Sequence, residues 1–420
     1  MPSDNPRRKS RPARRAPDAT GPTIQTSWPP LTYESLPWKA QYETSATSRS
    51  ERRKHQGPYR AAIPPQIADA GLELPSELVA LVEEASTEVV RFDELMGREI
   101  AHFSAILLRS ESAASSRIEN LTASARAIAE AEIGTSRRKN AAAVVANTRT
   151  MTPALELAGD IRGPSILAMH RALMNETDPI NAGRWRTEQV WIGGGNPGPH
   201  LAMFVPPQHS RVADAIDDLV KFIERDDLPV LVHAALAHAQ FETIHPFTDG
   251  NGRTGRALVQ AVLRHGQLTR NVTVPVSAGL LADTKAYFGA LTTYRLGDPI
   301  PILSQFAHAA FRAVANGREL VNELRQIRKS WQQSVQARSD SAVWRLADLL
   351  LRRPVVNARV VAEELGLDVG NVHRYIKPLL DAGILTESYD VKRNQVWRAA
   401  EVLAALDAFA ARAGRRTPPA

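Results

Sequence analysis

The segment that most constrains the fold lies in the middle of the chain, between two stretches of helical pattern. It reads His-Pro-Phe-Thr-Asp-Gly-Asn-Gly-Arg-Thr-Gly-Arg over residues 245–256. Its glycines let backbone N–H groups approach an anion closely, and the N-terminus of the helix that follows attracts negative charge. We therefore expect a helical core in which two helices meet at an anion-binding loop.

The polar side chains of this loop add the groups needed for attack on a nucleotide phosphate. Arg253 and Arg256 are three residues apart, so both lie on one face of the first helical turns and can bind phosphate oxygens. Asp249 is a hard oxygen ligand suited to Mg²⁺, and His245 is a base that works near neutral pH. The alternative interpretation is a tight turn between helices with surface arginines. The complete arrangement favours phosphate chemistry.

Composition excludes several other classes of protein. The chain has 420 residues, enough for more than one module, and 43% of them are hydrophobic. It contains no run of apolar residues long enough for a transmembrane helix, so no membrane partner is expected. No apolar segment follows the basic N-terminus, which argues against a secretory signal. The absence of cysteine excludes disulfides and thiolate metal sites, and it fits a cytoplasmic protein.

The positive charge is concentrated at one end of the chain. Residues 1–60 hold twelve Lys and Arg against five Asp and Glu, and this excess equals the net charge of +7 for the whole chain. Residues 1–35 are also rich in Pro, Ser and Thr, which predicts a disordered basic arm. A solvated tail is favoured there over a segment that attracts nucleic acid.

Helical periodicity dominates the middle of the chain and predicts a mainly α fold. It begins at Ser76, a suitable N-cap. It is interrupted by two short extended segments that are joined by a stretch rich in Gly and Pro, which predicts a β-hairpin or flap at 190–206. His233 and His238 are expected to be packed helix residues rather than ligands. The expected units are an N-terminal helical region at 36–155, a catalytic core at 156–315 and a linker helix at 316–339.

The C-terminal segment predicts a winged helix-turn-helix at 340–400, followed by a helix and tail at 401–420. Three helices with a turn at Gly366 precede two strands, the order of that fold, and we expect the unit to fold on its own. The segment is not strongly basic, so a protein-docking or dimer module is favoured over contact with DNA, and both stay open. The candidate DNA-reading residues are Asn371, His373, Arg374, Lys377, Lys392, Arg393 and Asn394.

The loop at 245–256 matches the signature HxFx[D/E]GNGRxxR of the Fic family at every specified position. The chain resembles this family over residues 38–315, which implies a helical core with a β-hairpin flap and transfer of AMP from ATP to a protein hydroxyl. The Doc branch, which phosphorylates, has Lys where this chain has Gly252. The resemblance implies that His245 is the base, that Asp249 holds Mg²⁺, and that the nucleotide site comprises Phe247, which anchors the loop, with Asp249, Gly250, Asn251, Gly252, Arg253 and Arg256.

Three further segments resemble parts of Fic proteins. Residues 190–206 resemble the flap that holds a target peptide by strand addition. Tyr287 and Phe288 resemble an aromatic pair that lines the adenine pocket. The residues that match the inhibitory motif [S/T]xxxE[G/N] are Ser115, Glu119 and Asn120. The resemblance implies that the Glu119 carboxylate pairs with Arg256 and takes the guanidinium needed by the γ-phosphate.

These observations favour an autoinhibited protein adenylyltransferase that uses ATP and Mg²⁺ and modifies a target protein and itself. Two alternatives remain open at this point. One is an enzyme of the same fold that removes AMP with the help of Glu119. The other is a DNA-associated regulator whose Fic core senses a nucleotide. The target protein and the formation of a homodimer are left open by the sequence.

Overall fold

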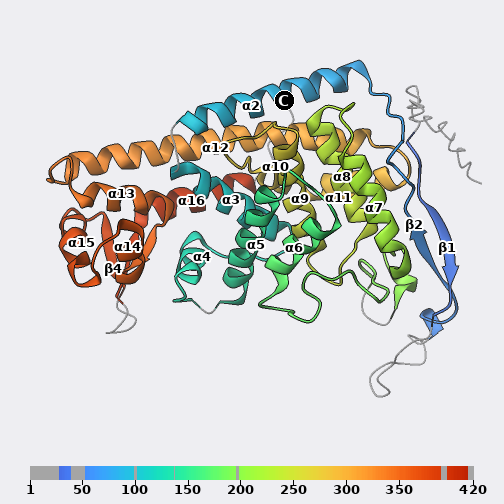
Figure 1. Cartoon of the computed structure of the whole chain (residues 1–420), viewed down its shortest axis with the longest axis horizontal. Helices are drawn as coiled ribbons and strands as arrows, with labels where there is room; N and C mark the ends of the chain where they lie inside the picture. Colours follow the sequence, from blue (N-terminus) through green and yellow to red (C-terminus); the bar gives the residue numbers. More distant parts are fainter. Residues whose placement is uncertain are drawn as a thin grey trace, which may run out of the picture.

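Helices make up most of the computed structural model, which describes residues 28–38, 53–98, 102–136, 138–194, 198–388 and 395–414. The mainly α fold expected from the sequence is confirmed (Figure 1). Up to the phosphate loop the helices are α2 (Ser76–Arg98), α3 (His102–Ile118), α4 (Ala125–Glu132), α5 (Lys139–Glu156), α6 (Gly163–Met174), α7 (Val212–Ile223) and α8 (Val230–Ile244). After the loop come α9 (Asn251–His265), α10 (Val276–Leu281), α11 (Thr284–Arg295) and α12 (Ile300–Ser334).

The core of the larger unit is built around α8. Every residue from Leu231 to Ile244 is buried, which explains why this helix is apolar on all sides instead of amphipathic. The helices α7, α9, α11 and α12 pack against it. His233 and His238 are buried in this helix, as expected: His233 Nε2 contacts the carbonyl oxygen of Phe222, and His238 Nε2 lies 2.7 Å from the hydroxyl of Tyr287.

A small sheet near the N-terminus corrects the expected boundary of the basic arm. Strand β1 (Thr32–Leu36) pairs antiparallel with β2 (Tyr59–Ile63). Trp28 is only 2% exposed and packs edge-on against Phe222. The prediction of a disordered arm reaching residue 35 is therefore wrong for residues 28–35, because a buried indole and a strand partner hold this segment on the helical core. Residues 1–27 lie outside the described part of the chain.

The flap predicted at 190–206 is present in a short form. Ile192 and Phe204 form a single antiparallel bridge, with the Ile192 amide donating to the Phe204 carbonyl at 2.8 Å. Between the two bridge residues, a 3-10 turn, Pro199–Leu201, lies at the end of the connection that is rich in Gly and Pro. The flap is joined to the N-terminal sheet, since the amide of Ala62 donates to the carbonyl of Val205 at 3.0 Å.

The C-terminal unit has the winged helix-turn-helix architecture that the sequence predicts. Its helices are α13 (Ala342–Arg352), α14 (Ala358–Leu365) and α15 (Val372–Asp381). Strand β5 (Val396–Ala399) lies between β3 (Val355–Asn357) and β4 (Leu385–Ser388). Gly366 has a φ of 65°, the left-handed conformation that ends α14. The wing residues Lys392, Arg393 and Asn394 lie outside the described residues.

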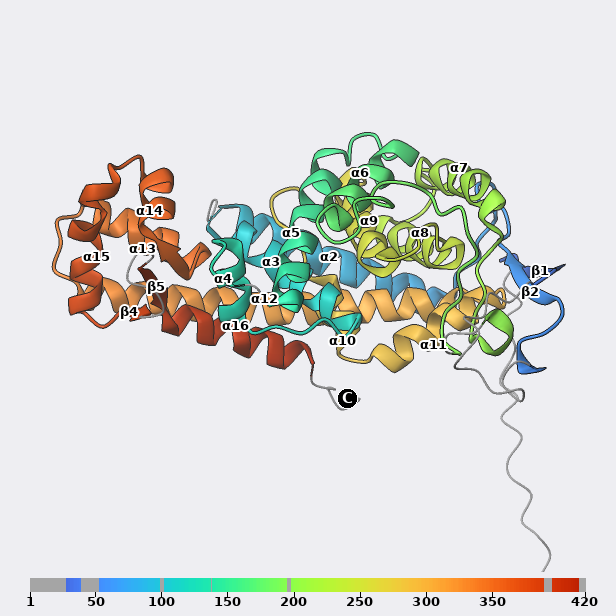
Figure 2. The same ribbon diagram turned by 90° about the horizontal axis from the view of Figure 1, so that it is seen from below.

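Two helices join this unit to the Fic-like part, and they correct the expected domain division. Helix α12 runs without a break from Ile300 to Ser334, so the expected boundary between residues 315 and 316 falls inside one helix. Helix α16 (Ala400–Ala413) packs along α12, α3 and α4 (Figure 2). Both units share one continuous apolar core. The expectation that residues 340–400 fold on their own is not supported, because separation would expose these apolar faces.

Candidate functional site

The phosphate loop connects α8 to α9 through two left-handed residues. His245 ends α8 with a φ of 50° and still donates its amide to the carbonyl of Phe241 at 2.9 Å. Gly250 precedes α9 with a φ of 77°, and a side chain there would collide with Leu173. The loop therefore reverses direction between the two helices and leads directly into the N-terminus of α9, where free amides can bind an anion.

Aromatic stacking and one amide side chain hold the loop on the core. The Phe247 ring is fully buried and stacks on the His170 imidazole, with ring centroids 3.6 Å apart. The side-chain amide of Asn251 accepts from the Phe247 amide and donates to the Phe247 carbonyl, both at 2.8 Å. Phe247 thus anchors the loop as predicted. The side chain of Asn251 is used for structure, which leaves its backbone to face a ligand.

His245 stands at the mouth of the loop as a neutral imidazole. Burial, together with the positive charges of Arg295 and Arg186, lowers the pKa of His245 far below its usual range. Its Nδ1 atom has no hydrogen-bond partner and lies 3.8 Å from a carboxylate oxygen of Glu242. Burial also raises the pKa of Glu242 to about 7. The imidazole is therefore unprotonated at neutral pH, the state in which it can accept a proton.

Arg253 and Asp249 form an open pair at the N-terminus of α9. Arg253 is buried, its Nε has no partner, and one guanidinium nitrogen lies 3.6 Å from Asp249 Oδ2. The other Asp249 oxygen accepts from the Gly250 amide at 2.6 Å, while the side chain as a whole is 70% exposed. A buried cation with an unsatisfied N–H group is suited to an anionic ligand, because such a ligand would supply the missing acceptor.

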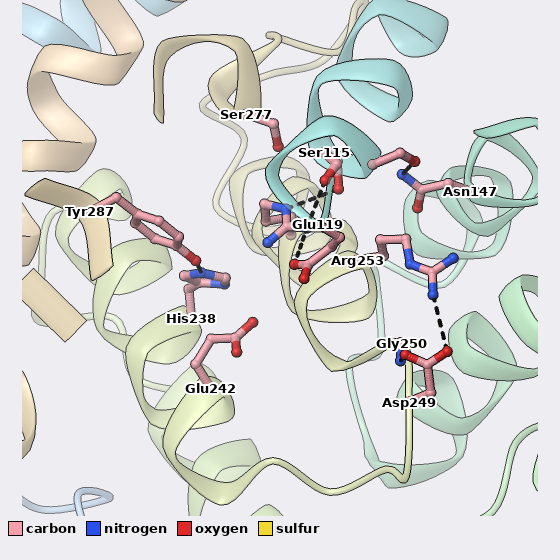
Figure 3. Close-up of polar contacts among 12 residues, drawn as sticks. Ser115, Glu119, Asn147, His238, Glu242, Asp249, Gly250, Arg253, Ser277 and Tyr287 are labelled. Carbon is pink, nitrogen blue, oxygen red and sulfur yellow. Dashed lines mark hydrogen bonds and ion pairs between the residues drawn. The ribbon is translucent and has the colours of Figure 1, made fainter. Parts of the chain in front are cut away.

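Arg256 is already engaged by the segment that the sequence identified as inhibitory, whose Ser115 and Glu119 are labelled in Figure 3. Its side chain is 2% exposed and donates from Nε to Ser115 Oγ at 2.9 Å and from Nη2 to Glu119 Oε1 at 2.8 Å. Burial alone would lower the pKa of Arg256, but the Glu119 carboxylate contributes to a net rise. A Cβ atom at Gly252 would collide with this carboxylate. Glu119 therefore occupies the space above the α9 N-terminus.

The end of α3 explains the third position of the inhibitory motif. Asn120 has a φ of 61°, the left-handed region that Gly and Asn adopt most readily among the amino acids. Its amide donates to the carbonyl of Arg117 at 3.0 Å. The helix α3 therefore ends at Ile118, and Glu119 lies in the turn that follows it. The [G/N] requirement thus follows from backbone geometry.

Two residues that support the site were missed as functional candidates in the sequence. Arg186 donates from Nε to the His245 carbonyl at 2.9 Å and from Nη1 to the Glu188 carbonyl, so it ties the flap to the loop. Asn147 on α5 is buried and donates to the Ser112 carbonyl at 2.8 Å, which fixes α3 from its other side. Arg186 lies just before the flap at 190–206, so its position beside the flap could have marked it as a candidate. No local sequence signal marked Asn147.

The two aromatic residues on α11 face different surroundings. Tyr287 is 1% exposed, with its hydroxyl 2.7 Å from His238, whereas Phe288 is 49% exposed. Tyr287 therefore offers no free face to a nucleotide in this structure, and the prediction that it lines the adenine pocket is not supported. That Phe288 lines the adenine pocket stays a prediction.

The residues present fit a magnesium ion that is bound mainly through a nucleotide. Mg²⁺ is held in many phosphate-transfer sites by one or two carboxylates together with substrate phosphates and water. Asp249 is one exposed carboxylate beside the anion site, which meets this requirement. Within the described ranges, no group of three or more acidic or histidine side chains could hold a metal alone. In the same ranges no helix is long and apolar enough to cross a membrane.

Comparison with known proteins identifies two domains in the chain. Residues 163–263 match the model of the Fic/DOC family, and residues 345–386 match that of a winged helix-turn-helix DNA-binding domain. The chain thus carries a Fic/DOC domain followed by a winged helix. It is 33% identical to protein adenylyltransferase fic-1 of Caenorhabditis elegans over 146 residues, which are 34% of this chain and 26% of that protein. It is also 36% identical to protein adenylyltransferase Fic of Drosophila erecta over 101 residues, 23% of this chain and 19% of that protein.

The chain spans about a quarter or less of the length of these relatives. The fold likeness extends further. A Fic family protein from Desulfovibrio desulfuricans G20 superposes with a TM-score of 0.51 at 22% identity, covering 80% of this chain and 98% of that one. The Fic-type fold is therefore not restricted to the segment that the family model matches.

Proposed function

We propose that this protein transfers AMP from ATP to Ser, Thr or Tyr hydroxyls of a target protein and of itself, and that Glu119 inhibits the transfer. The observation that carries the proposal is the buried, unsatisfied guanidinium of Arg253 at a helix N-terminus beside a neutral His245. The similar relatives that are named protein adenylyltransferases support it. On the basis of its lack of cysteine, we place the protein in the cytoplasm.

In the proposed reaction, the hydroxyl oxygen of the target attacks the α-phosphorus of ATP. A new O–P bond forms, the bond between the α-phosphorus and the bridging oxygen to the β-phosphate breaks, and pyrophosphate leaves. His245 accepts the proton of the hydroxyl. A bound triphosphate places negative charge near the imidazole and raises its pKa toward neutrality, which makes it a stronger base during the reaction than in the empty site.

The amides of Gly250, Asn251 and Gly252 would bind the α- and β-phosphates at the start of α9. Arg253 would contact the β-phosphate, and Arg256 the γ-phosphate. Bound Mg²⁺, with Asp249 as its protein ligand, would offset charge on the phosphate oxygens. The exposed Phe288 would contact the adenine.

Glu119 is well placed to inhibit this reaction. Its carboxylate bonds Arg256 at 2.8 Å and lies against Gly252, so a γ-phosphate at Arg256 would meet a like charge in the same space. ATP would then bind with its γ-phosphate displaced and its α-phosphate out of line with the hydroxyl. Misplacement of about 1 Å in such a reaction costs roughly a hundredfold in rate. The side chain of Glu119 is 38% exposed, so it can leave without unfolding the core.

The flap at 190–206 is the proposed docking site for the target. Met203 and Leu201 are exposed there, and Ile192 and Phe204 form a short antiparallel bridge whose edge could accept a further strand. An extended peptide added to this edge would bring its hydroxyl toward His245, because Arg186 ties the flap to the His245 carbonyl.

The test is incubation of the full chain with Mg²⁺ and ATP labelled at the α-phosphate. Glu119→Gly should raise self-labelling by about a hundredfold, since the productive phosphate position becomes available. Adding His245→Ala to that variant should lower labelling by roughly 10²–10⁴. Adding Arg256→Ala instead should cancel the gain, because both effects run through one contact.

The matched control is Glu176→Gly, which removes an exposed carboxylate far from Arg256 in sequence and should leave labelling unchanged. Labelling that is equal or lower in Glu119→Gly than in the wild type contradicts the inhibitory role. Release of AMP from pre-labelled protein that requires Glu119 favours the alternative, in which the enzyme removes AMP.

Contact with DNA is a second candidate function for the C-terminal unit. Asn371, His373, Arg374 and Lys377 are all exposed along one helical segment, which is the placement that a reading helix needs. A mobility-shift assay with the full chain over increasing salt tests this. Affinity that falls steeply with salt supports DNA contact, and no shift at low salt supports a protein-docking role.

A further inference from the structure

A cavity of about 500 Å³ lies between the inhibitory helix α3, the short helix α4 and the C-terminal helix α16. Its wall on α3 includes Ala113 and Arg117, whereas the phosphate site is reached by Ser115 on the same helix. Two residues along a helix differ by about 200° in direction, so the cavity lies on the opposite face of α3 from the phosphate site. It is therefore distinct from the nucleotide site.

The size and lining of this cavity are those of a site for a small organic molecule. Protein interiors leave few voids larger than a water molecule, whereas small-molecule sites span about 300–1,000 Å³. The cavity has a mostly apolar wall, formed by side chains from five helices and including Ala114, Ile128, Val144, Leu281, Leu406 and Phe409. Water in such a space finds few polar partners, so an apolar molecule would replace it favourably.

The charged groups of the lining determine which kind of molecule fits. Glu132 is paired with Arg109, and Asp407 accepts from the Ala125 amide at 2.8 Å, so both acids of the wall are occupied. Arg117 donates to the Ala410 carbonyl at 2.6 Å. Arg138 forms no ion pair among the described residues and stands at the solvent-exposed rim. The lining holds three arginines and two acids, so its net charge is positive.

We propose that this cavity binds a small monocarboxylic acid, with its apolar body between α4 and α16 and its carboxylate at Arg138. The apolar wall would stabilise the body through burial, and the guanidinium would select an acid over an alcohol or an amine of the same length. The proposal concerns binding and does not depend on the transfer of AMP.

The experiment is calorimetric titration of the full chain with decanoate, decanol and decyltrimethylammonium, in the absence of ATP. The wild type should bind decanoate most tightly and the ammonium compound least tightly. Ile128→Trp should weaken binding of decanoate at least about tenfold, because the indole fills the volume. Leu157→Trp, which places the same ring at an exposed position outside the cavity, should bind decanoate as the wild type does.

A second variant tests the charge without filling the cavity. Arg138→Gln should lower the affinity for decanoate by about threefold, which is the scale of an exposed ion pair. The affinity for decanol should not change. Arg149→Gln is its matched control on the surface of α5. Equal affinity of the wild type for decanoate and decanol would overturn the assignment to an acid. Undiminished binding in Ile128→Trp, or no binding by the wild type, would overturn the site itself.

Discussion

Replacing Glu242 by Gln should stabilise the protein at alkaline pH and leave it nearly unchanged at acid pH. Burial raises the pKa of the Glu242 carboxyl from 4.5 to about 7, and its Oε1 atom has no hydrogen-bond partner. The folded state therefore favours the neutral acid. The stability that comes from this preference is fully present below pH 4.5, and it is lost as the pH rises through about 7.

The size of the effect follows from the shift. The rise in the pKa of Glu242 from 4.5 to about 7 lowers the free energy of unfolding by about 3 kcal/mol between pH 4 and pH 8. With about 2.1 cal/mol/K of unfolding entropy per residue over 420 residues, this amounts to roughly 3 °C in Tm. Glutamine is neutral throughout, so Glu242→Gln should melt about 3 °C higher than the wild type at pH 8 and within about 1 °C of it at pH 5.

The assay is thermal unfolding of both proteins across this pH range, with the difference in Tm as the readout. The buried histidines and Glu111 titrate in both proteins, so subtraction removes most of their contribution. Glu84→Gln, at an exposed carboxyl of α2, is the matched control and should give no difference that changes with pH. A difference that is the same at pH 5 and pH 8, or a lower Tm of Glu242→Gln at pH 8, would refute the reasoning.

Three further predictions concern the loop, the inhibitory helix and the winged helix. Asn251→Ala removes both hydrogen bonds to the Phe247 backbone and should destabilise the protein by about 1–3 kcal/mol, measured by urea unfolding. No loss of stability would mean that the loop keeps its conformation without these two bonds. Arg117→Ala removes the hydrogen bond from α3 to the Ala410 carbonyl. If this bond stabilises the inhibitory position of Glu119 by about 1 kcal/mol, its loss should raise self-labelling about fivefold. An unchanged rate would show that α16 does not position the inhibitory segment. If the winged helix contacts DNA, Lys377→Ala should lower the slope of log affinity against log salt by about one, and an unchanged slope would remove Lys377 from the phosphate contacts.

The geometry of the candidate site could be predicted from the sequence because nearly all of it is local. His245, Asp249 and Arg253 lie within one loop and the first turn of one helix, so their spacing determines their geometry. The contact between Glu119 and Arg256 spans 137 positions, and it was accessible only because a short motif marks one partner. No comparable motif marks Asn147, whose bond to the Ser112 carbonyl depends on how α5 packs against α3.

The errors in the sequence prediction have physical causes. Residues 28–35 have the composition of a disordered arm, but burial of Trp28 against Phe222 depends on contacts almost two hundred positions away. Tyr287 and Phe288 are adjacent on a helix and point about 100° apart, so they face different surroundings. That difference was available from periodicity alone. The expected break near residue 316 failed because α12 keeps its buried stripe beyond that position, through Leu320, Val321 and Leu324.

Because α12 is continuous, the segment that matches the family model is smaller than the part of the protein that must fold together. The helix has 35 residues, a length of about 52 Å, and one end lines the Fic core while the other supports the C-terminal unit. A fragment cut at residue 263, where the family match ends, would lack α12 and with it the face that α12 packs against α8. Substitutions in the C-terminal core, such as at Trp331, would therefore lower the abundance of the folded protein without touching the loop at 245–256.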